Sequence, residues 1–206
     1  MAKFTVPNQT ATREEWLHCF ARAARVQFAD AGAPIDQINI RISVGFPSSG
    51  RRSNAIGECF HSSASEDGAR EIFIRPSLQS DVVEIAAVLT HELVHAALPD
   101  GEGHGKTFGK VARALGLEGK LTSTTGGEAW KAWAQPILDA IGPFPGAAIK
   151  DGVRAAGSGG KQTTRLIKCE CTECGLLFRT TRKWFEKVGE FTCPDSDCGG
   201  TVTVGG

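Results

Sequence analysis

The sequence predicts an α+β domain, in which a small mixed or antiparallel sheet packs on helices, followed by a small cysteine-rich module. Segments with apolar residues at helical spacing alternate with short runs in which apolar and polar residues alternate, as in strands. Five of the seven cysteines lie between residues 169 and 198, after a stretch rich in Gly, Ala and Pro. We therefore divide the 206 residues into a domain at 1–141, a flexible linker at 142–164 and a module at 165–206.

Composition excludes several classes of protein. Lys plus Arg and Asp plus Glu both number 23, and 41% of residues are hydrophobic, which argues against disorder and against a uniformly basic nucleic-acid coat. The N-terminus lacks an apolar export signal, and the apolar stretch at 85–98 is interrupted by charged residues and too short for a bilayer. An odd cysteine count without an export signal favours metal ligation. We expect a cytoplasmic protein with no membrane partner.

The first elements are an amphipathic helix and a sheet. The helix is expected at 12–31, where Thr12 and Glu15 can form a capping box and four apolar residues recur at every fourth position: Trp16, Phe20, Ala24 and Phe28. Strict alternation predicts a half-buried strand at 38–46, and two shorter strands are expected at 55–61 and 71–75, around a polar turn.

Three further helices follow. The longest is expected at 80–98, with Ser80 as its N-cap and Asp81 and Glu84 in its first turn. Pro99 and three nearby glycines end it. Shorter helices are expected at 106–115 and 128–141.

The segment His91-Glu-Leu-Val-His95 lies within the long helix. Residues four apart on a helix share a face, so both imidazoles can bind one Zn²⁺, and Glu92 is close enough to reach a water on the metal. A catalytic zinc needs a third protein ligand and an open position. His104 is the first candidate, because the glycines after Pro99 let the chain fold back. Glu118 and Glu128 are alternatives, whereas Glu102 looks like a solvated loop residue.

Three features together resemble the SprT-like (Spartan-like) zinc metalloprotease family: the HExxH string, the string His104-Gly-Lys-Thr-Phe108 (HGxxF) and the separate cysteine module. The resemblance covers most of residues 10–200. It implies a zincin-like metallopeptidase fold, His91, His95 and His104 as ligands of a catalytic zinc, and Glu92 as general base. It also implies a metalloendopeptidase whose protein substrates are bound or crosslinked to DNA.

The cysteine module contains two thiol pairs. Cys171 and Cys174 form a tight knuckle, and Cys193 and Cys198 form a second pair with a wider spacer, so four thiolates can hold a structural Zn²⁺ in a zinc ribbon. Cys169 can replace Cys171 as a ligand, since four residues separate Cys169 from Cys174, just as four residues separate Cys193 from Cys198. Disulfides are the alternative. Two cysteines are expected to be buried small residues: Cys19 and Cys59.

The module also has a local basic excess. Between residues 165 and 187 six basic side chains face three acidic ones, and an aromatic pair adjoins the basic residues. Such a patch can contact phosphates and stack on bases. The candidate nucleic-acid contacts are Arg179, Arg182, Lys183 and Trp184. The alternative is a solvated charged face with one buried tryptophan.

The expected reaction is peptide hydrolysis by a zinc-activated water, with Glu92 accepting the proton and returning it to the leaving amine. The chain contains no tyrosine, so oxyanion support must come from zinc, His61 or an arginine. An extended substrate can add to an edge strand, either 71–75 or 55–61. The alternative function is a non-catalytic zinc-binding protein whose ribbon binds nucleic acid or a protein partner.

Overall fold

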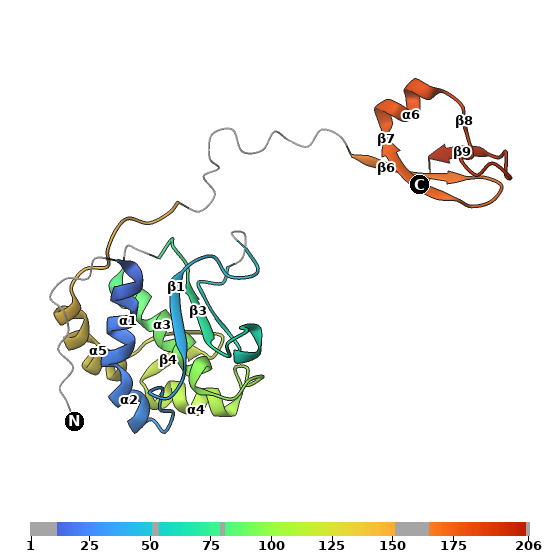
Figure 1. The fold of residues 1–206 in the computed structure, drawn as a ribbon. Coiled ribbons are helices and arrows are strands. Elements are labelled where there is room, and N and C mark those ends of the chain that lie inside the picture. Colours follow the sequence, from blue (N-terminus) through green and yellow to red (C-terminus); the bar gives the residue numbers. More distant parts are fainter. Residues whose placement is uncertain (1–11, 51–53, 79–80, 151–164, 205–206) are drawn as a thin grey trace. The chain divides into compact units, whose positions relative to one another are not determined.

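The computed structural model describes residues 12–50, 54–78, 81–150 and 165–204. The chain divides into two compact units, Met1–Gly152 and Val153–Gly206, and each is described by itself (Figure 1). Both mix helices with small sheets, as the predicted α+β class requires. No helix in the described ranges is long and apolar enough to cross a membrane.

The first unit contains a three-stranded sheet in the order β1-β3-β2. β1 (Ile40–Val44) runs parallel to β3 (Arg70–Ile74), and β2 (Gly57–Phe60) runs antiparallel to it. Alternation places Ile42 and Ile72 in the core, as expected for half-buried strands. β3 is central and β2 lies at an edge, so of the two strands expected to offer an edge to substrate, only 55–61 does so.

The predicted first helix is two helices, α1 (Arg13–Ala23) and α2 (Arg25–Asp30), which meet at Ala24. The capping box is confirmed: the Thr12 hydroxyl accepts from the backbone N–H of Glu15, and the Glu15 carboxylate accepts from that of Thr12. The apolar stripe is buried along both helices, because the interruption at Ala24 keeps the residues on one face.

The central helix is α3 (Val82–Ala97). It packs on the three-stranded sheet through β2 and β3, and it also contacts three helices and a strand of a second, smaller sheet: α1, α4, α5 and β5. Its residues from Ile85 to Val94 are buried, as expected of a helix that is apolar nearly all round. The Asp81 carboxylate caps it by accepting from the backbone N–H groups of Val83 and Glu84. Ser80, the predicted cap, lies outside the described residues.

Four elements follow α3: α4 (Lys106–Ala114), β4 (Leu117–Lys120), β5 (Ser123–Gly126) and α5 (Glu128–Ile141). The two helices were predicted. The β4–β5 hairpin was not, and it packs on α3 through β5.

The chain remains attached to the first unit beyond α5. The Trp16 indole donates to the carbonyl of Gly142 at 2.9 Å, and Phe144 packs edge-on against that indole. Ile149 donates its backbone N–H to Pro76 at 3.0 Å. The predicted linker therefore does not begin at Gly142, because one aromatic residue in it is buried on α1. Its part at 151–164 lies outside the described residues.

The second unit is a four-stranded antiparallel sheet in the order β7-β6-β9-β8, with a short helix after β7. Its elements are β6 (Leu166–Cys171), β7 (Leu177–Thr181), α6 (Arg182–Val188), β8 (Phe191–Thr192) and β9 (Thr201–Val204). Among residues 165–204 of this unit only four hydrophobic residues are buried, and three of them are cysteines. A core this small needs an additional crosslink or metal to be stable.

Candidate metal centres

Three imidazoles converge at the C-terminal end of α3. His91 and His95 project from one face of the helix, and the glycine-rich loop that follows brings His104 back to them. The Nε2 atom of His104 lies 3.0 Å from that of His91 and 3.1 Å from that of His95. Tetrahedral zinc with bonds of about 2.0–2.1 Å places its nitrogen ligands about 3.3–3.4 Å apart, a few tenths of an ångström more than these distances. The donor set and its spacing therefore fit such an ion.

The ring of Phe108 contacts all three imidazoles. It lies on α4, is fully buried, and has ring-centroid distances of 4.9, 4.5 and 5.0 Å to His91, His95 and His104. The last residue of the HGxxF string thus contacts every ring of the cluster, a role that the sequence alone did not assign.

The other ring nitrogens are also engaged. Nδ1 of His91 lies 2.8 Å from the hydroxyl oxygen of Thr124 on β5, and the ring of His95 makes a hydrogen bond to the backbone of Glu102. Burial, with smaller contributions from the neighbouring imidazoles, lowers the pKa of His91 to about 3 and that of His95 to about 4. Both rings are therefore neutral at physiological pH, the state in which imidazole binds metals.

Glu92 lies beside the first imidazole and against the edge strand. It is 6% exposed, and its burial, followed by repulsion from Glu58, raises its pKa to about 8, although a hydrogen bond from the backbone of Cys59 acts in the opposite direction. β2 passes close over this carboxylate: a Cβ at Gly57 would lie 2.6 Å from Glu92 Oε1. Only glycine fits there without a shift of the glutamate.

The cluster opens into a cleft of about 450 Å³. Its walls are β2, α3, the loop at 101–104 and residues 122–124 of the β4–β5 hairpin, so the edge strand and the imidazoles face the same space. His61 also lines it, with Nδ1 3.6 Å from a carboxylate oxygen of Asp100. Asp100 is in turn held by Arg70 at 2.9 Å and by the Ser62 hydroxyl at 2.8 Å.

The alternative third ligands do not join the cluster. Among the described residues, the group around α3 consists of the histidines alone. Glu128 is exposed and pairs with Lys131, and the Glu118 side chain lies over Gly127. The Glu102 carboxylate accepts a weak hydrogen bond from the Thr107 hydroxyl at 3.4 Å.

The two cysteines of the first unit differ in burial. Cys19 is buried as expected, whereas Cys59 is half-buried and lines the cleft.

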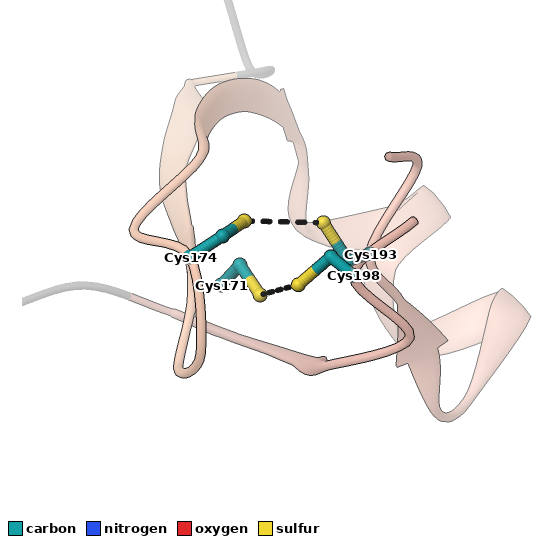
Figure 2. Close-up of side chains that lie close together, drawn as sticks. All are labelled: Cys171, Cys174, Cys193 and Cys198. Atoms are coloured by element: carbon teal, nitrogen blue, oxygen red, sulfur yellow. Dashed lines mark hydrogen bonds between the residues drawn. The ribbon is translucent and has the colours of Figure 1, made fainter. Parts of the chain in front are cut away.

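Four thiols form a second cluster in the second unit (Figure 2). The sulfurs of Cys171 and Cys198, and those of Cys174 and Cys193, are 3.6 Å apart, and all four lie within 4.8 Å of one another. Disulfide sulfurs are about 2.0 Å apart, whereas tetrahedral zinc with bonds near 2.3 Å places them about 3.8 Å apart. The geometry therefore fits a bound ion and not a disulfide.

The knuckle is built to hold a thiolate at Cys171. Hydrogen bonds from the backbone of Cys174 and Glu173 lower the pKa of Cys171 to about 7. Cys169, the alternative ligand, is fully buried in the small core and is not part of the cluster.

The candidate nucleic-acid contacts lie on the surface of the second unit. Trp184 is 51% exposed, while its neighbour Phe185 is half-buried and stacks on Phe191, so the aromatic residue that packs into the small core is the phenylalanine. The Lys187 ammonium lies 4.7 Å from the Trp184 ring centre. Arg179 and Lys183 are exposed, and Arg182 is 3.8 Å from Glu186.

Comparison of the chain with protein-family models, with curated proteins and with solved structures gave no match to any of them.

Proposed function

We propose that this chain is a zinc-dependent metalloendopeptidase with a zincin-like catalytic domain and a zinc ribbon. The observation that carries the proposal is the convergence of His91, His95 and His104 beside a buried glutamate, in a cleft that also exposes a strand edge. The resemblance to the SprT-like proteases rests on the same residues and supports the proposal. By that resemblance we extend it to substrates that are proteins associated with DNA.

The three imidazoles would hold the zinc ion, and the four cysteine thiolates of the ribbon would hold a second, structural one. When bound, the catalytic zinc supplies an activated water and polarises the scissile carbonyl. Glu92 is the carboxylate next to the ligands. A cation held by the three imidazoles would favour its ionised form and so lower its pKa from the raised value of the metal-free site. In that form it accepts the proton of the attacking water and delivers it to the leaving amine.

β2 offers the substrate a place to bind. In the described part of the chain it pairs only with β3, and its other edge lines the cleft. An extended peptide added there would have its backbone held by hydrogen bonds close to Glu92, which favours cleavage of unfolded or loop segments.

His61 is the group we propose to support the developing oxyanion, since the chain has no tyrosine and Asp100 orients this imidazole at the cleft. His61→Ala is expected to lower kcat about 10- to 100-fold, with KM and zinc content unchanged. Unchanged kcat would remove this residue from the mechanism.

The direct test of the peptidase is Glu92→Gln. The amide has nearly the same shape and cannot take the proton, so cleavage of an unfolded protein substrate is expected to fall about 10²- to 10⁴-fold while zinc content stays constant. Glu128→Gln, an exposed glutamate of α5, is the matched control. Equal cleavage by Glu92→Gln and the wild-type chain would leave the alternative, a non-catalytic zinc-binding protein.

The second unit supports a further candidate function, binding of single-stranded nucleic acid. The exposed Trp184, with basic side chains on the same helix and on β7, combines a stacking surface with phosphate contacts. In the full chain, Trp184→Ala is expected to weaken binding of a single-stranded oligonucleotide by about 1–3 kcal/mol, whereas Leu177→Ala, another exposed apolar residue, should not. Removing the charge of Arg179 or Lys183 should weaken binding of all sequences alike and should also reduce the salt dependence of the affinity.

A further inference from the structure

We propose that Thr124 is a positioning residue, whose hydroxyl fixes the ring of His91 with Nε2 directed at the metal. The proposal deepens the metal site of the proposed function and rests on it. Thr124 belongs to β5, in the hairpin that sequence patterns did not predict, and its hydroxyl oxygen lies 2.8 Å from Nδ1 of His91.

The direction of this hydrogen bond follows from the chemistry of a neutral imidazole. One ring nitrogen carries a proton and the other has a free lone pair. Nε2 of His91 faces the other two imidazoles, so as a ligand it must supply the lone pair, and Nδ1 then carries the proton. Thr124 Oγ1 therefore accepts the hydrogen bond that Nδ1–H donates. Such partners fix both the tautomer and the orientation of ligating histidines.

The position of Thr124 is set by packing and does not depend on a bound ion. Leu117 of the hairpin is fully buried, and Trp130 of α5 packs so closely on Gly126 that a Cβ there would lie 2.3 Å from the indole. The Trp130 indole N–H donates to the Thr90 hydroxyl at 3.0 Å, one residue before His91. Trp130 thus connects the hairpin to the part of α3 that carries the first ligand.

The experiment compares three variants of the full chain. Thr124→Val keeps the shape of the side chain and removes the acceptor, and Thr124→Ser keeps the acceptor. Thr125→Val makes the same chemical change at the next, exposed residue of the same strand. The measurement is the zinc affinity of the weaker of the two sites, by competition with a chromogenic chelator while the cysteine site remains filled.

We expect Thr124→Val to weaken zinc binding about 10- to 100-fold, with Thr124→Ser close to the wild-type chain and Thr125→Val unchanged. The visible absorption of the cobalt-substituted histidine site should shift in Thr124→Val alone, because the ring is no longer held in one orientation. Thermal unfolding of the metal-free variants shows whether the hairpin still folds.

Wild-type affinity in Thr124→Val would overturn the proposal. So would an equal loss in Thr124→Ser, because the hydroxyl would then not be the group responsible. A wild-type chain that binds zinc only at the cysteines would overturn the site itself. Activity retained by Glu92→Gln would end the peptidase proposal but would leave this comparison of affinities intact, so the two failures are distinguishable.

Discussion

Phe108 contributes to the histidine cluster without offering a ligand atom. Its ring lies within 5.0 Å, between centroids, of all three imidazoles, and it is fully buried. Each imidazole therefore has one side packed against a rigid surface, which limits the ring orientations available before a metal binds. Preorganised ligands lose less conformational entropy on binding.

Replacing Phe108 should affect metal binding more than folding alone explains. Phe108→Leu keeps a buried apolar side chain, so we expect a stability loss of about 1–3 kcal/mol and a weaker zinc affinity at the histidines. Phe28→Leu, at another fully buried phenylalanine, is the matched control. Chelator competition should separate the two variants. Equal zinc affinities after similar losses of stability would show that Phe108 only fills the core.

The buried titratable groups of the site give the metal-free protein a defined pH dependence. The pKa of Glu92 is raised from 4.5 to about 8. Between these two values the folded chain binds a proton on Glu92 that the unfolded chain does not, so the free energy of unfolding increases as the pH falls below 8. The pKa of His91 is lowered from 6.5 to about 3, and that of His95 to about 4. Below pH 6.5 the unfolded chain takes up those protons, and stability falls.

We therefore expect the stability of the chelator-treated chain to be greatest near pH 6.5. Urea unfolding followed by tryptophan fluorescence measures it, because three of the four tryptophans lie in the first unit. Glu92→Gln should lose the decline on the alkaline side, and His91→Gln should reduce the decline on the acidic side. A monotonic rise in wild-type stability between pH 5 and pH 8 would contradict this assignment of the two slopes.

At the level of elements, the loop between α3 and α4 decides whether the third ligand is in place. Gly101 has a φ of +88°, which permits the reversal of the chain. Asp100, just before it, fastens the loop to the sheet through Arg70 of β3 and to the segment after β2 through Ser62 and His61. The Arg70 side chain is 13% exposed, so this ion pair is partly shielded from water.

Asp100→Ala is expected to destabilise the first unit and to weaken zinc binding, because the Arg70 guanidinium loses its partner and the loop loses its attachment. Asp67→Ala, which breaks the exposed pair with Arg41, is the control and should leave zinc affinity unchanged. Calorimetry and chelator competition measure the two effects. An Asp100→Ala chain with wild-type affinity would show that the glycine loop positions His104 unaided.

The elements differ in how far sequence patterns could define them. α3 was predictable because its apolar period, its end at Pro99 and its two histidines four apart are local features. The β4–β5 hairpin was missed for two reasons. Its turn, Leu121-Thr122, carries no Asn-Gly or similar signal, and the sequences of its two strands, LEGK and STTG, do not alternate between apolar and polar residues. Thr124 was missed with it, since its contact with His91 spans 33 residues.

At the level of the whole molecule, the two units rely on metal to different degrees. The first has an extensive apolar core, so its histidine site can be empty without loss of the fold. The second buries little besides cysteines, and its two hairpins are joined at the thiol cluster (Figure 2). Metal binding in such a module contributes directly to folding.

The two centres should therefore respond independently to mutation and to chelation. We expect two zinc ions per chain by elemental analysis, with one lost in Cys171→Ser and the other in His95→Ala. Cys171→Ser should unfold the second unit while the first keeps its cooperative thermal transition, because the residues that form the large core lie in Met1–Gly152. His95→Ala should leave both units folded. Cys169→Ala is the matched control for the ribbon, since that thiol lies outside the cluster and is fully buried in the small core. Loss of a zinc ion in this variant while the second unit stays folded would contradict the assignment of Cys171 as the ligand.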